Sequence, residues 1–122
     1  MKALVVDDSM TFRRIVIKSL AEIGITDYVE AGDGEEALAA TKAAPFDVIL
    51  LDWNMPRLTG IDTVRALRGE GNKTPIIMVT TEAEKTRVIE AIRAGVNDYL
   101  IKPFTPQQLG EKIKAILPVA AT

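Results

Sequence analysis

The sequence contains no cysteine and no histidine among its 122 residues. Without cysteine the chain forms no disulfide bond and offers no thiolate nucleophile. Without histidine it has no imidazole to act as a base, a nucleophile or a metal ligand. Carboxylates, hydroxyls, lysine amines and backbone groups must therefore carry any chemistry.

An excess of positive charge and a long hydrophobic run are also missing. The formal net charge is -2, whereas binding to phosphate backbones takes a surplus of Lys and Arg, so we expect no direct nucleic-acid partner. No apolar stretch is long enough to cross a bilayer, and the one that begins at Ala3 is too short for a signal peptide. We therefore expect a cytoplasmic protein without membrane insertion.

The length and composition are those of one globular domain. Hydrophobic residues make up 48% of the chain and charged residues 26%, close to the average for soluble domains, which excludes disorder as the main state. We expect a single domain over residues 1–122. The few residues after the last predicted helix leave no room for an output domain.

Strand-like apolar runs alternate with segments of helical period along the whole chain. The predicted strands cover residues 3–6, 28–31, 48–51, 76–79 and 98–101, and the predicted helices cover 10–23, 35–44, 61–68, 82–94 and 106–117. This alternation is typical of an α/β protein with a parallel sheet. The second strand is short and carries Glu30, which favours a position at the sheet edge.

Two of the predicted helices are preceded by the capping-box pattern. It occurs at Thr81–Glu84 and again at Thr105–Gln108, where Pro106 takes the first helical position. In this motif the threonine hydroxyl accepts from a first-turn amide, and the fourth residue reaches back to the threonine N–H. We therefore expect helices to start directly after Thr81 and Thr105.

Polar residues stand at the ends of four predicted strands. Asp7 and Asp8 follow the first strand, Asp52 the third, Thr80 the fourth and Lys102 the fifth. Parallel strands end at one edge of the sheet, and ligands bind outside that edge, so these side chains should converge. Taken singly, each has an ordinary explanation as a helix cap, a turn residue or a surface lysine. Their common edge is what favours a functional site.

The types of these residues indicate phosphoryl chemistry with a divalent metal. Three crowded carboxylates repel one another unless a cation joins them. Oxygen ligands favour Mg²⁺ over Zn²⁺, in agreement with the missing Cys and His. Asp52 is the best-placed nucleophile, because carboxylates form acyl phosphates. Lys102 and the Thr80 hydroxyl can then contact phosphoryl oxygens.

The strand-end residues, at this spacing, resemble those of the two-component response regulator receiver domain over the whole chain. Within that family the sequence is most similar to the chemotaxis response regulators, through Asp52–Pro56, Met78–Thr80, Glu82–Glu84, Tyr99 and Lys102–Phe104. The resemblance implies a doubly wound, flavodoxin-like fold. It would have five parallel strands in the order 2-1-3-4-5 and five helices.

The resemblance also implies the roles of the site residues. Asp52 would take a phosphoryl group from a histidine kinase, so that the protein is a phosphoacceptor that assists its own phosphorylation and dephosphorylation and not a turnover enzyme. Mg²⁺ would bind Asp8, Asp52 and the backbone carbonyl of Asn54, with Asp7 acting mainly through water. The peptide bond between Lys102 and Pro103 would be cis.

Phosphorylation, by the same resemblance, would pull Thr80 inward and let Tyr99 follow. The face built by the fourth helix, the fifth strand and the last helix would change, including Val88, Tyr99, Ile101 and Lys112. That face would bind a downstream target such as the flagellar motor switch, and a phosphatase is a possible further partner. Tyr99 also fits the ordinary description of a half-buried strand aromatic, and the sequence does not separate the two.

Other hypotheses fit parts of the same pattern. A flavodoxin-type protein would hold a flavin phosphate after the first strand, where Asp7 and Asp8 would repel it. An aspartyl-phosphate hydrolase usually has its nucleophile after the first strand, and Asp52 follows the third. A pseudo-receiver that binds without phosphorylation stays open, although the intact site argues against it. So does a single-domain phosphorelay shuttle or interaction module outside chemotaxis, since Ser9, Thr81 and Arg87–Val88 depart from the chemotaxis pattern.

Overall fold

A parallel sheet of five strands forms the centre of the computed structural model, which describes residues 1–116. The strands are β1 (Lys2–Val6), β2 (Asp27–Ala31), β3 (Val48–Leu51), β4 (Ile76–Thr80) and β5 (Asp98–Ile101). Their order is β2-β1-β3-β4-β5, and every neighbouring pair is parallel. The order implied by the resemblance is confirmed, and the short strand that carries Glu30 lies at an edge as predicted.

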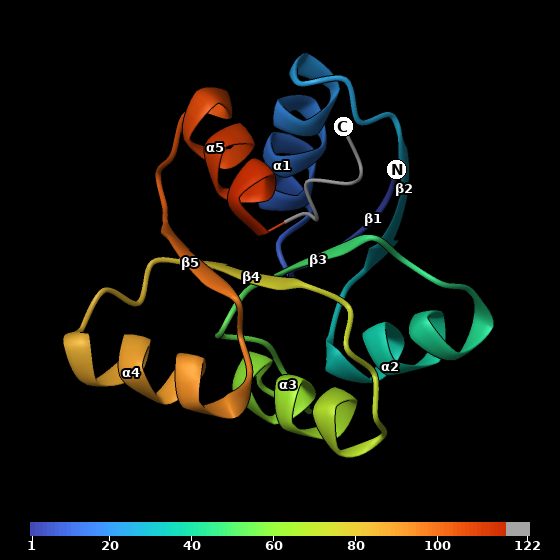
Figure 1. The fold of residues 1–122 in the computed structure, drawn as a ribbon, viewed down its shortest axis with the longest axis vertical. Coiled ribbons are helices and arrows are strands. Elements are labelled where there is room, and N and C mark those ends of the chain that lie inside the picture. The colour runs from blue at the N-terminus through green and yellow to red at the C-terminus, as the bar shows by residue number, and fades with distance from the viewer. Residues whose placement is uncertain (117–122) are drawn as a thin grey trace.

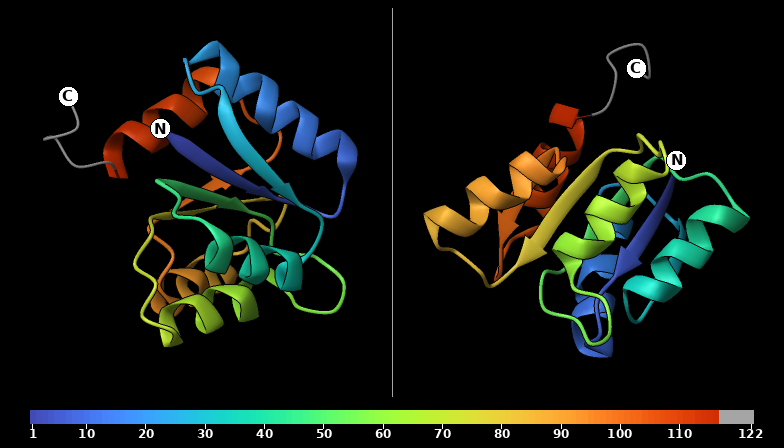
Figure 2. Two further views of the ribbon diagram at one scale, coloured as in Figure 1. Left: turned by 90° about the vertical axis from the view of Figure 1, so that its right-hand side faces the viewer. Right: turned by 90° about the horizontal axis from the view of Figure 1, so that it is seen from below.

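Helices cover both faces of this sheet. They are α1 (Met10–Glu22), α2 (Gly34–Ala43), α3 (Gly60–Gly69), α4 (Lys85–Ala94) and α5 (Pro106–Ile116). α1 and α5 lie on one face, and α2, α3 and α4 lie on the other (Figure 1). The side views show the three layers (Figure 2). Leu117 and Pro118, which were predicted to complete and end the last helix, lie outside the described residues. No helix of the described chain has the length and apolar character needed to cross a membrane.

The central strands are buried on both faces, which explains their unbroken apolar sequences. Ile49 and Leu51 of β3 pack into the core beneath α2, α3 and α4, whereas Val48 and Leu50 pack into the core beneath α1 and α5. All four side chains are at most 1% exposed. β3 is therefore buried up to its last residue, and Asp52 is the first polar side chain after it.

The predicted capping box at Thr105 forms. The backbone N–H of Gln108 donates to Thr105 Oγ1 over 3.1 Å, and the N–H of Thr105 donates to Gln108 Oε1 over 2.9 Å. α5 then starts at Pro106, as expected.

The predicted capping box at Thr81–Glu84 is wrong. α4 begins at Lys85, and its N-cap residue, Glu84, makes no side-chain capping bond. The backbone of Glu82 is held by tertiary partners instead: its N–H donates to Thr80 Oγ1 over 3.3 Å, and its carbonyl accepts from the Tyr99 hydroxyl over 2.6 Å. Because Tyr99 occupies the carbonyl that a first helical turn would use, residues 81–84 form a loop at the carboxyl edge of the sheet.

A glycine allows α3 to start directly against the loop that follows β3. The Gly60 N–H donates to the Trp53 carbonyl over 2.8 Å. A Cβ at Gly60 would overlap the Asp52 carbonyl oxygen and would lie 2.8 Å from Trp53 Cα. The position of the backbone at Asp52 thus depends on the missing side chain at residue 60.

We expect Gly60→Ala to lower the free energy of unfolding by about 2 to 3 kcal/mol, because the added methyl group must displace backbone. Gly69→Ala, at the other end of α3, is the matched control, since a Cβ there meets nothing within 4 Å. The control should be neutral or stabilising by up to about 1 kcal/mol. Urea unfolding measures both, and equal stabilities of the two variants would contradict the argument.

Candidate functional site

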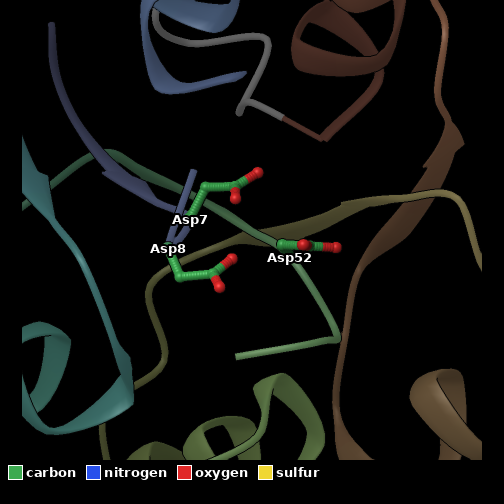
Figure 3. Close-up of side chains that lie close together, drawn as sticks. All are labelled: Asp7, Asp8 and Asp52. Carbon is green, nitrogen blue, oxygen red and sulfur yellow. The ribbon is translucent and has the colours of Figure 1, made fainter. Parts of the chain in front are cut away.

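Three aspartates converge at the carboxyl edge of the sheet. Asp7 and Asp8 follow β1, Asp52 follows β3, and each offers a carboxylate oxygen within 4.8 Å of the others (Figure 3). Asp7 is 4% exposed and Asp52 is 9% exposed, whereas Asp8 is open to solvent. We call these three residues the acidic cluster. The structure thus brings together the carboxylates that the sequence placed at strand ends.

Lys102 enters the acidic cluster from the end of β5. Its Nζ donates to Asp7 Oδ2 over 2.6 Å and lies 3.6 Å from Asp52 Oδ2, and its side chain is 4% exposed. The peptide bond between Lys102 and Pro103 is cis, as the resemblance implied. One ammonium group lies beside two of the three carboxylates of the cluster, so the cluster keeps an excess of negative charge and attracts a further cation.

Asp7 is held through both of its carboxylate oxygens. Oδ1 accepts from the Ser9 N–H over 2.9 Å, while Oδ2 accepts from Lys102. Ser9 is also the N-cap of α1, because its Oγ accepts from the Phe12 N–H over 3.3 Å. Ser9 is therefore the residue that caps α1, and neither Asp7 nor Asp8 is its N-cap.

Asp52 is buried at the end of β3. Its Oδ1 accepts from the Trp53 N–H over 2.8 Å, and Thr80, at the end of β4, is fully buried beside it. Burial raises the pKa of the Asp52 carboxyl above its usual value, and Asp7 adds to this; the Thr80 hydroxyl, the Lys102 ammonium and the Trp53 N–H oppose it. Without a bound metal, an ionised Asp52 carboxylate therefore lowers the stability of the folded state.

Two loops meet across the mouth of the site. The Asn54 side chain donates through Nδ2 to Glu82 Oε1 over 3.2 Å, which connects the loop after β3 to the loop after β4. Asn54 is exposed and Glu82 is half-buried. The amide nitrogen of the Asn54 side chain thus points to Glu82.

The predicted switch residues lie on α4, β5 and α5. Tyr99 is 9% exposed, and its hydroxyl donates to the Glu82 carbonyl over 2.6 Å. Ile101 is 39% exposed, and Val88 is half-buried. Lys112 Nζ lies 3.1 Å from Asp98 Oδ1. Tyr99 is therefore more buried than a half-buried strand aromatic, and it contacts the loop that begins at Thr80.

Two side chains that contact site residues were not predicted to do so. The Phe12 ring lies against the ammonium group of Lys102, and the Arg87 guanidinium lies 5.4 Å from the centroid of the Trp53 ring. In the sequence Phe12 is one apolar residue in the helical period of α1. Its spacing carries no signal that separates a site residue from a core residue.

Comparison with known proteins agrees with this geometry. Residues 3–114 match the model of the response regulator receiver domain. The chain belongs to this receiver-domain family. The chemotaxis protein CheY of Pseudomonas aeruginosa is 48% identical over 118 residues, which are 95% of each chain. A chemotaxis protein CheY homolog of Campylobacter jejuni is 49% identical over 120 residues, 96% of this chain and 92% of that one.

Solved structures of receiver domains have the same fold. The chemotaxis protein CheY4 of Vibrio cholerae superimposes with a TM-score of 0.88 at 41% identity, covering 95% of this chain and 98% of that one. The receiver domain of the Francisella response regulator 1452 gives 0.86 at 35% identity, covering 93% of each chain. The receiver fold, including its strand order, is therefore shared over nearly the full described length.

In this receiver domain the Tyr99 phenol should ionise late. Burial, followed by the charges of Glu82 and Asp52, raises the pKa of Tyr99 to about 12, with Arg87 opposing. The ordinary phenol value is about 10, so the neutral phenol stabilises the fold below that pH and its contribution is lost as the pH rises from about 10 to 12. Stopped-flow absorbance at 295 nm, compared with Tyr99→Phe, isolates this step. An ionisation near pH 10 would contradict the burial argument.

We expect Asp52→Asn to raise the thermal unfolding midpoint of the metal-free receiver domain at neutral pH. The pKa of Asp52 is raised in the folded state, so folding with a charged carboxylate costs free energy that a neutral amide of the same shape avoids. This cost is complete above the raised pKa and vanishes below the ordinary carboxyl value of about 3.9. Calorimetry in chelator between pH 7 and pH 3 should show the two midpoints converging in acid. A lower midpoint for Asp52→Asn at pH 7 would refute the expectation.

Proposed function

We propose that this receiver domain is a chemotaxis response regulator that accepts a phosphoryl group on Asp52 from a histidine kinase. The observation that carries the proposal is the placement of a buried Asp52 between two other aspartates and the Lys102 ammonium, at the edge of a parallel sheet where ligands bind. The relatives named as chemotaxis proteins, at 48 to 49% identity, support the pathway.

Phosphoryl transfer would use Oδ2 of Asp52. Oδ1 is engaged by the Trp53 N–H, whereas Oδ2 faces Lys102, so Oδ2 is the better nucleophile. It forms a bond to phosphorus as the bond between phosphorus and the kinase histidine breaks, and the departing imidazole nitrogen takes up a proton. The protein thus acts as a phosphoacceptor that assists its own modification and is not a turnover enzyme.

The donor set of the acidic cluster fits Mg²⁺. All of its side-chain ligands are carboxylate oxygens, which suit this hard cation. Asp7 already has both oxygens engaged by Ser9 and Lys102, which favours an indirect role through water. Asp8, Asp52 and the Asn54 backbone carbonyl would be the direct ligands. When bound, Mg²⁺ supplies positive charge that offsets the charge on the transferring phosphoryl group.

Thr80 and Lys102 would hold the phosphoryl group after transfer. Lys102 Nζ is already 3.6 Å from Asp52 Oδ2, so a small movement brings it to a phosphoryl oxygen. The Thr80 hydroxyl would donate to another phosphoryl oxygen, and Thr80 Oγ1 is the atom that holds the Glu82 N–H. Its movement therefore pulls on the loop of residues 81–84, whose Glu82 carbonyl holds Tyr99.

This connection would carry the signal to the face formed by α4, β5 and α5, with Val88, Tyr99, Ile101 and Lys112 as contact residues. A downstream target such as the flagellar motor switch would bind there, and a phosphatase would be a further partner. The match covers 95% of the length of the Pseudomonas aeruginosa relative. The cytoplasmic location stays a prediction. No observation favours the alternative of a shuttle outside chemotaxis.

The test is the intact mass of the protein after incubation with a small acyl-phosphate donor, with Mg²⁺ and with chelator. We expect a gain of one phosphoryl group that requires the metal and is absent in Asp52→Asn. Binding of the phosphorylated form to a purified flagellar motor-switch protein, with the unphosphorylated form as control, then tests the pathway. If no mass is gained under any condition, the acidic cluster has a structural or pseudo-receiver role.

A further inference from the structure

An aromatic ring lies against the ammonium group of Lys102. Lys102 Nζ lies 3.9 Å from the centroid of the Phe12 ring. Within the described residues this is closer than the contact of Arg87 with Trp53 at 5.4 Å or that of Lys2 with Phe46 at 5.5 Å. A cation over a ring face within about 6 Å is attracted by the quadrupole of the ring, and the attraction grows when water is excluded. With its side chain 4% exposed, Lys102 meets that condition.

The contact between Phe12 and Lys102 completes a closed chain of interactions that also includes Asp7 and Ser9. Asp7 accepts from the Ser9 N–H, and Ser9 Oγ accepts from the Phe12 N–H at the start of α1. The Phe12 side chain then lies against the Lys102 ammonium, which donates back to Asp7. The first turn of α1 and the end of β5 are thereby fixed to each other at the edge of the acidic cluster.

Phe12 has no comparable role in the hydrophobic core. It is half-buried, and within residues 1–116 it belongs to neither of the two clusters of packed apolar side chains, although Ile17 of the same helix and Phe104 both pack against the cluster beneath α1 and α5. Its ring face is therefore directed at a charged group, where an aliphatic side chain would offer no electrostatic attraction.

We infer that Phe12 is a positioning residue that holds the Lys102 ammonium beside Asp52 before the phosphoryl group arrives. The lysine side chain is a flexible four-carbon stem with a point charge at its end, so its location must be restrained from outside. Lys102 Nζ lies 2.6 Å from Asp7 and 3.6 Å from Asp52. Asp7 alone would therefore draw the ammonium away from Asp52. The Phe12 ring supplies a third contact to the ammonium group, besides Asp7 and Asp52. This inference rests on the proposed phosphorylation of Asp52.

The experiment compares ring-free with ring-retaining variants of Phe12. Phe12→Leu should lower the rate constant of phosphorylation by a small acyl-phosphate donor with Mg²⁺ by about 2- to 30-fold, the range equivalent to a cation–aromatic contact. Phe12→Tyr keeps the ring and should stay near the wild-type rate. Phe12→Met is a second ring-free variant, in case Phe12→Leu does not fold. Phe46→Leu is the matched control, because it removes a ring that faces Lys2 and not the site.

A nuclear magnetic resonance readout separates positioning from general loosening of the fold. The ε-methylene protons of Lys102, held over a ring face, should be shifted upfield in the wild type and in Phe12→Tyr, and this shift should vanish in Phe12→Leu and Phe12→Met. Equal rates in the wild type and both ring-free variants, or an equal loss in Phe12→Tyr, would overturn the inference. Absence of the ring-current shift in the wild type would also overturn it.

The two proposals fail differently. If the wild type takes up no phosphoryl group, the proposed function falls, and with it any role of Phe12 in phosphoryl transfer. If the wild type is phosphorylated and the ring-free variants match it in rate, only the role of Phe12 falls.

Discussion

The ion pair between Lys102 and Asp7 is the contact on which the site depends. It joins the end of the last strand to the end of the first across 95 positions of sequence, with both side chains about 5% exposed or less. A buried charge pair with one partner removed leaves an uncompensated charge. The ends of the parallel strands set the backbone positions of these aspartates, and the Lys102 ammonium partly offsets the repulsion between Asp7 and Asp52.

Stability and function occupy different parts of the molecule. The strands beneath the edge are apolar on both faces and form two separate cores with the helices, which supply the hydrophobic stabilisation. At the edge, the charged form of Asp52 is disfavoured, because burial raises its pKa. Asp52 thus lies outside both apolar cores, next to the loops that follow β3 and β4.

Most of the fold followed from local sequence patterns. The alternation of strands and helices, the edge position of β2 and the start of α5 were predicted, and the strand order came from the family resemblance. The start of α4 was not predictable, because the Glu82 carbonyl binds the Tyr99 hydroxyl, a partner seventeen positions away that no local motif contains. Convergence of the acidic residues followed from the geometry of parallel strands. The contact of Phe12 with Lys102 could not be predicted in this way. The helical period shows which face of α1 is apolar, but it does not show which group that face contacts.

The location of Lys102 on β5 has a consequence for biosynthesis. Asp7, Asp8 and Asp52 leave the ribosome in the first half of the chain, and the lysine that completes their surroundings follows fifty residues after Asp52. Because domains in general fold as units, an incomplete chain presents three aspartates without the ammonium that arranges them. A nascent chain that has not yet reached Lys102 therefore lacks one of the charged groups of this site.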